Sequence, residues 1–124
     1  MRLFILFFFL FSCSYGSREE VCVDTDEQME KIALQLSVIK NKVELERNIS
    51  TLSKKFYKLS GLIILADRLE GVPKPLPPGK GATLLQEEML RLYKIHGARE
   101  LIEKAQLKGL KALEKYEETK ESLR

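Results

Sequence analysis

Few residues of this 124-residue chain have the side-chain chemistry that catalysis or metal binding requires. His96 is the only histidine, and it falls on the apolar stripe of a predicted helix, so we interpret it as a helix-terminal or partly buried residue rather than a general base. The pairs Glu87-Glu88 and Glu117-Glu118 would point in different directions on a helix. Metal sites need clustered ligands, so we predict no metal. Since neither His96 nor the carboxylate pairs suit acid–base catalysis, we also predict no enzymatic activity and no cofactor.

The two cysteines, Cys13 and Cys22, have different expected fates. Cys13 ends the segment "LFSC", a loose match to a bacterial lipoprotein box in which the thiol would carry lipid. The main expectation is that Cys13 is removed with a signal peptide. Cys22 is then an odd thiol in an oxidising compartment, just before the first predicted helix. Two interpretations of Cys22 stay open: an intermolecular disulfide, or an unpaired or capped thiol.

The stretch "GVPKPLPPGKGAT", residues 71–83, contains parts of two binding motifs. A phosphate-binding loop follows G-x-x-x-x-G-K-[ST], but Gly81 follows Lys80 here and Lys74 stands at the position of the first glycine. The proline spacing suits a polyproline ligand, yet the domains that bind such ligands are chiefly cytosolic. We therefore interpret residues 71–82 as a Pro/Gly connector between helices.

The first sixteen residues predict export. Arg2 precedes an unbroken apolar run over residues 3–11, and small residues follow it. The run is shorter than the roughly 18 residues of a membrane-spanning helix, so residues 1–16 are predicted to be a signal peptide. The expected location is secreted or extracytoplasmic. In the alternative, lipid on Cys13 anchors the protein at the outer face of a bacterial membrane, and only then is membrane contact expected.

The remaining residues, 17–124, are enough for one small domain. Loss of Arg2 from the 21 basic residues would leave 20 of them against 18 acidic residues. Such a small excess of positive charge is too weak for nucleic-acid binding. We expect no nucleic-acid partner.

An amphipathic helix is predicted from about residue 26 to residue 70. Thr25 and Gln28 have the spacing of a capping box. Apolar residues then recur at intervals of three and four, at Met29, Ile32, Leu36, Ile39, Val43, Ile49, Leu52, Phe56, Leu59 and Ile63. The stripe slips between Val43 and Ile49, which predicts a bend near residues 47–50, and Gly61 marks a second position where the helix could break.

The slip includes Asn48-Ile49-Ser50, which is an N-glycosylation acceptor in a eukaryotic host. Asn48 lies off the apolar stripe, so a glycan there is expected to leave the core intact. An unused site is an equally open interpretation.

Two aromatic residues of the same predicted helix, Phe56 and Tyr57, stand beside basic residues, namely Lys54, Lys55 and Lys58. This combination is typical of a membrane-surface or anion-binding patch. We favour the simpler interpretation, that the lysines solvate the outer face of the helix.

A second helical arm is predicted from residue 84 to about residue 121. Thr83 and Gln86 repeat the capping-box spacing. The inner stripe contains Leu85, Met89, Leu92 and His96, followed by Ile102, Ala105, Gly109, Ala112, Leu113 and Tyr116. Gly97 is expected to cap or kink this arm.

These elements predict an all-α fold, either an antiparallel helical hairpin or a small helical bundle after the signal peptide. The two arms, 26–70 and 84–121, would be roughly 65 and 55 Å long at about 1.5 Å per residue. Two arms packed like a coiled coil bury only one stripe each, so the core would be thin.

The thin core motivates the functional hypothesis of a secreted, non-enzymatic interaction module. Its exposed apolar positions would be covered by a second copy or by another protein, and the candidates are Leu62, Ile64, Leu107 and Leu110. The alternative is a carrier of lipid or another apolar ligand in a cavity between helices, suggested by the apolar residues 62–65 beside Gly61 and Ala66.

Overall fold

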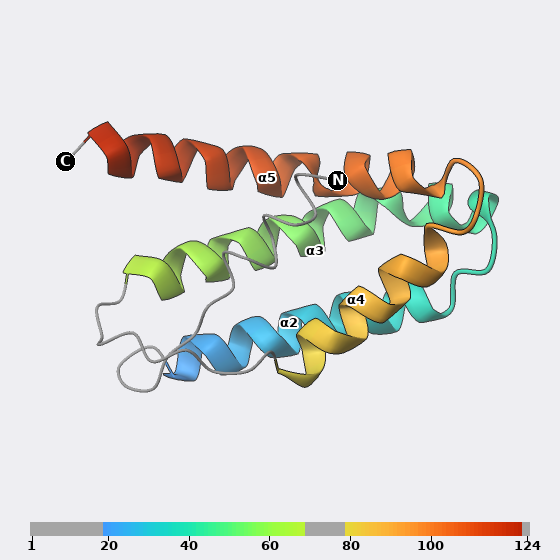
Figure 1. Cartoon of the computed structure of the whole chain (residues 1–124), viewed down its shortest axis with the longest axis horizontal. Helices are drawn as coiled ribbons and strands as arrows, with labels where there is room; N and C mark the ends of the chain where they lie inside the picture. Colours follow the sequence, from blue (N-terminus) through green and yellow to red (C-terminus); the bar gives the residue numbers. More distant parts are fainter. Residues whose placement is uncertain (1–18, 69–78, 123–124) are drawn as a thin grey trace.

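The computed structural model describes residues 19–68 and 79–122, and it is all helical over these ranges (Figure 1). The helices are α2 (Glu19–Ser37), α3 (Lys42–Arg68), α4 (Lys80–Leu92) and α5 (Ala98–Ser122). The predicted all-α class is confirmed, in the form of a small helical bundle. The predicted signal peptide with Cys13 and most of the predicted connector lie outside the described residues.

The bundle consists of two helical hairpins, α2–α3 and α4–α5 (Figure 1). The helices of the first hairpin pack on each other, whereas α4 packs on α2 and α5 packs on α3 rather than on each other. Gln28 and Gln35 of α2 bond Lys55 and Asn48 of α3, so these two helices are antiparallel. Between the hairpins the direction is the opposite. Asp26 of α2 contacts Gly81 near the start of α4, and Leu36 contacts Arg91 near its end, so α2 and α4 are parallel. In the same way, Ser60 of α3 lies against Gly109 of α5 and Asp67 bonds Tyr116, so α3 and α5 are parallel.

The prediction of one long first arm is wrong, because the chain turns at residues 38–41. Asn41 Oδ1 accepts the Glu44 amide at 2.9 Å, and Glu44 Oε2 accepts the Lys40 amide at 2.8 Å. This reciprocal pair satisfies free amides at the start of α3. The slip in the apolar stripe correctly indicated a break, but the predicted position, residues 47–50, lies several residues after the observed turn. In contrast, α3 continues unbroken through Gly61.

Both predicted capping boxes are wrong as well. Thr25 lies inside α2, where its hydroxyl donates to the Val21 carbonyl, and Gln28 reaches across to α3. Thr83 lies inside α4, which is preceded by Gly79 as N-cap with no side-chain cap from its own segment. The second arm does break near Gly97, but Gly97 is not the cap: α4 ends at Leu92 with Tyr93 as its C-cap, and Gly97, with a φ of +81°, is the last residue of the loop before α5.

The ends of α2 and α4 are capped by each other's side chains. Asp26 Oδ1 accepts the Gly81 amide at 3.0 Å and the Ala82 amide at 3.3 Å, at the N-terminus of α4. Arg91 of α4 donates to the carbonyls of Leu36 (2.8 Å) and Ile39 (3.1 Å), at the C-terminus of α2. Carboxylate and guanidinium therefore meet the helix ends whose partial charges they complement.

The core lies between the hairpins and contains most of the predicted stripe. The largest fully buried side chains are Phe56, Met29, Ile32, Leu36, Ile39, Leu45, Leu52, Leu59, Met89, Leu92, Ile102 and Leu110. Val43 is 56% exposed, because the turn at 38–41 rotates it outward and brings Leu45 into the core instead. His96 is also off the inner stripe, since it lies exposed in the loop between α4 and α5.

Two helical glycines are expected to respond oppositely to Gly→Ala. Gly61 is exposed with no atom within 4 Å of an added Cβ, so Gly61→Ala should stabilise the monomer by about 1 kcal/mol. A Cβ on Gly109 would collide with Ser60 Oγ and lie 2.9 Å from the Phe56 carbonyl oxygen, so Gly109→Ala should cost about 1–3 kcal/mol. Urea unfolding at micromolar concentration, followed by circular dichroism, measures both. Equal effects of the two changes would contradict the α3–α5 packing.

The Asp26 cap predicts a graded loss of stability. Asp26→Ala removes the acceptor and the charge, and should lower the free energy of unfolding by about 0.5–2 kcal/mol. Asp26→Asn keeps an acceptor for the Gly81 and Ala82 amides, so it should fall between wild type and Asp26→Ala. Asp24→Ala on the exposed side of α2 is the matched control and should change little. An Asp26→Ala protein as stable as wild type would rule out the cap.

Candidate functional site

The four predicted surface residues differ in exposure. Leu107 is 44% exposed, as predicted for a contact position. Leu62 and Ile64 are half-buried, and Ile64 packs against the core. Leu110 was wrongly assigned to the surface: it is 1% exposed, because α5 is covered on that side by the rest of the bundle. Of the four predicted surface residues, only Leu107 on α5 is strongly exposed. On α3 the exposed apolar residues include Tyr57 and Leu65 instead.

Asn48 and Cys22 both lie in helices. Asn48 is half-buried between α2 and α3, where its Nδ2 donates to the Glu44 carbonyl at 2.7 Å and its Oδ1 accepts from Gln35 at 2.9 Å. A glycan on Nδ2 would disrupt this contact, contrary to the expectation that it would leave the packing undisturbed. The Cys22 backbone belongs to α2 rather than to an arm before the helix, and its side chain lies outside the described part of the structure.

The most distinctive surface is formed by α3 and α5 together, and we call it the basic face. Its cations recur at helical spacing and comprise Lys54, Lys58 and Arg68 on α3 and Lys104, Lys108, Lys111 and Lys115 on α5. Lys108 Nζ lies 5.9 Å from the centroid of the Tyr57 ring, which joins the two helices at the surface. None of these seven cations forms an ion pair with another described residue.

Apolar side chains lie among these cations. Tyr57 is 52% exposed and Leu65 is 45% exposed on α3, while Leu107 follows Lys104 by three residues on α5. Spacings of three and four put these residues beside the lysines on the same helix face. The basic face therefore combines positive charge with large apolar groups, as protein-binding surfaces often do.

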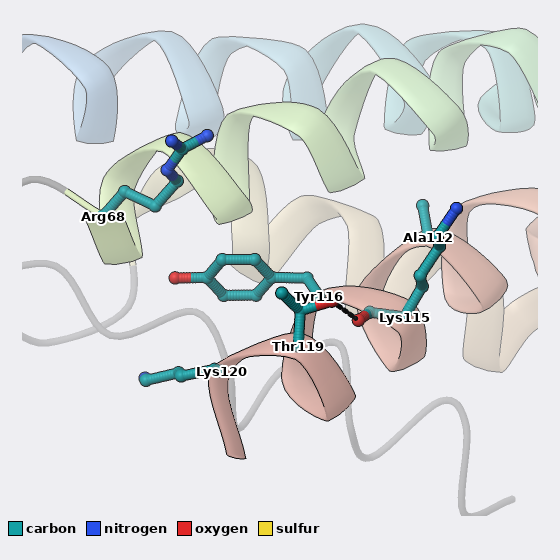
Figure 2. A pocket seen from close by; sticks show the side chains of 6 residues that line it. All are labelled: Arg68, Ala112, Lys115, Tyr116, Thr119 and Lys120. Atoms are coloured by element: carbon teal, nitrogen blue, oxygen red, sulfur yellow. Dashed lines mark hydrogen bonds between the residues drawn. The ribbon is translucent and has the colours of Figure 1, made fainter. Parts of the chain in front are cut away.

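At one end of the basic face, α3 and α5 form an open groove of about 520 Å³. Figure 2 shows its lining, which consists of Arg68, Ala112, Lys115, Tyr116, Thr119 and Lys120. The Tyr116 hydroxyl donates to Asp67 Oδ2 at 2.7 Å, and Lys120 Nζ donates to the same oxygen at 2.9 Å. Asp67 thus offsets Lys120, and Arg68 and Lys115 are left to attract an anionic group.

Burial and the neighbouring carboxylate raise the pKa of Tyr116 to about 12, with burial the larger cause. Tyr116 is therefore protonated at neutral pH and acts as a hydrogen-bond donor to Asp67, not as a base. In the loop between α4 and α5, Tyr93 is similar. Burial, followed by the charge of Glu103, raises its pKa to about 12, while Arg99 stacks 4.9 Å from its ring centroid.

Over residues 19–68 and 79–122, no three His, Cys, Asp or Glu side chains come together as a metal site would require. No described helix combines the length and apolarity needed to cross a bilayer. Comparison with known protein families, curated proteins and solved structures found no match to this chain.

Sequence reasoning found part of the basic face and missed the rest. Tyr57 and its lysines were noted on α3, but the α5 ridge was not, although Lys104, Lys108, Lys111 and Lys115 recur every three or four residues. That spacing was a usable signal. The bonds from Tyr116 and Lys120 to Asp67 join residues about fifty positions apart, and no local pattern announces such contacts.

The raised pKa of Tyr116 predicts a loss of stability in alkali. The folded-state pKa of about 12 lies above the usual 10.0, so the stabilising contribution is complete below pH 10 and is lost as the pH rises through 12. In a Tyr93→Phe background, ultraviolet titration of tyrosinate should detect Tyr116 near pH 12. Asp67→Asn should move this transition part of the way toward pH 10. An unchanged transition would show that Asp67 does not contact Tyr116.

Proposed function

We propose that the protein is an exported, non-enzymatic helical interaction module that binds a protein partner through the basic face. The observation that carries the proposal is the combination of seven cations, without ion pairs to described residues, and three exposed apolar side chains on adjacent helices. Large exposed apolar groups gain free energy when a partner covers them. The surrounding charge favours an acidic partner surface and speeds its association.

The proposed export rests on residues 1–16, with the lipid-anchored form at Cys13 as its alternative. An intermolecular disulfide at Cys22, in α2, would reinforce the association. The carrier alternative is weaker, because the apolar segment that suggested it packs into the bundle: Ile63 is 5% exposed and Ala66 is 7% exposed.

The proposal predicts that apolar truncations on the basic face abolish partner binding. Leu65→Ser with Leu107→Ser should remove a specific partner from affinity captures made in the native source, detected by mass spectrometry, because both anchors are lost. Leu90→Ser on α4 is the matched control: Leu90 is 50% exposed but belongs to another face. All variants should retain the wild-type circular dichroism.

Two results would contradict the proposal. One is a partner lost equally with Leu90→Ser. The other is wild-type protein that captures no partner and also sediments as a monomer. Native mass spectrometry of the same preparation tests the carrier alternative, since co-purified lipid would add discrete mass to the protein.

A further inference from the structure

The exposed surface of α3 has a gap at Gly61. Gly61 lies in the middle of a 27-residue helix, where glycine costs about 1 kcal/mol relative to alanine. It is exposed, and an added Cβ would meet nothing within 4 Å, so the packing of this bundle gives no reason for it. Small residues on a helix surface allow a second helix to approach closely.

The gap belongs to a ridge of the basic face. Residues at spacings of three and four share one side of α3, and the ridge through Gly61 consists of Lys54, Lys58, Gly61, Leu65 and Arg68. Tyr57 and Leu65, one turn on either side of Gly61, are about half exposed. A docking helix would therefore meet lysines, then a shallow gap, then an apolar side chain.

The outer ridge of α2 has the complementary pattern. It runs Val23, Glu27, Glu30, Leu34, again at spacings of four and three. Val23 is 52% exposed and Leu34 is 61% exposed, and Glu27 is exposed between them. Glu30 pairs at 3.7 Å only with Lys80, whose side chain is 76% exposed. In total α2 carries six carboxylates and one lysine.

We propose that a second copy of this chain is the partner of the basic face, and that its α2 ridge docks on α3 over Gly61. Leu34 of one copy packs into the gap between Tyr57 and Leu65 of the other, and Glu27 and Glu30 face the lysines. This inference rests on the proposed function and specifies its partner. Within one molecule the two ridges face outward on different helices, so only another copy can bring them together.

Single substitutions at the contact test the inference, because a change that stabilises the monomer can weaken self-association. Gly61→Leu fills the gap and should weaken self-association at least tenfold, measured by sedimentation equilibrium from micromolar to submillimolar concentration in low-salt buffer. Gly61→Ala should weaken it less while stabilising the monomer. Leu34→Ser should weaken association as Gly61→Leu does, and Leu90→Ser should leave it unchanged. Added salt should weaken the wild-type association, because the charge pairs are exposed.

Charge exchange provides the decisive test. Variant one replaces Lys54, Lys58 and Lys108 with Glu, and variant two replaces Asp24, Glu27 and Glu30 with Lys. Each alone should be monomeric, because like charges then face each other. An equimolar mixture should associate, because the intact α2 carboxylates of variant one meet the intact basic face of variant two, and the two exchanged surfaces also carry opposite charges. Circular dichroism of each variant checks that it is folded.

Three outcomes would overturn the inference: wild-type protein that is monomeric over the whole range, a mixture that stays monomeric, or Gly61→Leu that associates like wild type. Monomeric protein that sediments with phosphatidylserine vesicles would assign the basic face to membranes instead and would also overturn it. A monomer that still captures a foreign protein dependent on Leu65 and Leu107 would overturn only the second-copy assignment and leave the proposed function standing.

Discussion

The arrangement of the bundle depends on two charged side chains at the ends of the α2–α4 pair. Parallel helices place like partial charges side by side, which is unfavourable unless charged groups compensate them. Asp26 meets the free amides at the start of α4, and Arg91 meets the last carbonyls of α2. The approach is so close that a Cβ on Gly81 would collide with the Asp26 carbonyl oxygen. Glycine at that position is therefore part of the contact.

This fixed pairing determines the surface on which the proposed function rests. Once α2 and α4 are parallel, the short turns that follow them make α3 and α5 run in the same direction as well (Figure 1). Gly109 then packs against Ser60, and Tyr57 comes beside Lys108. Lysines that are evenly spaced along two separate helices are thereby gathered on one face, where their mutual repulsion is weakened by water and salt.

Polar contacts set the register inside the first hairpin. An apolar stripe alone allows neighbouring helices to slide by a turn, because it repeats every three or four residues. The Gln28 side chain bonds the Lys55 carbonyl at 3.1 Å, and the Gln35 amide contacts Asn48 and Thr51 at 2.9 Å each. A shift of one turn would leave the buried Gln28 and the half-buried Gln35 and Asn48 without these partners, which is costly. These contacts also occupy the side-chain amide of Asn48, to which a glycan would be attached.

The sequence by itself determined the all-helical class, most of the core and a break of the second arm near Gly97, because apolar periodicity and the positive φ that glycine permits are local properties of the chain. It even contained the start of α3, in Asn41 and Glu44, although the apolar stripe runs past this position, from Leu36 to Val43, and obscured it. Only the tertiary structure decided that Leu110 is buried, that α4 is capped by Asp26 and that the lysines share a face. Each of these depends on which helices become neighbours, and contacts between residues some fifty positions apart leave no periodic trace in the sequence.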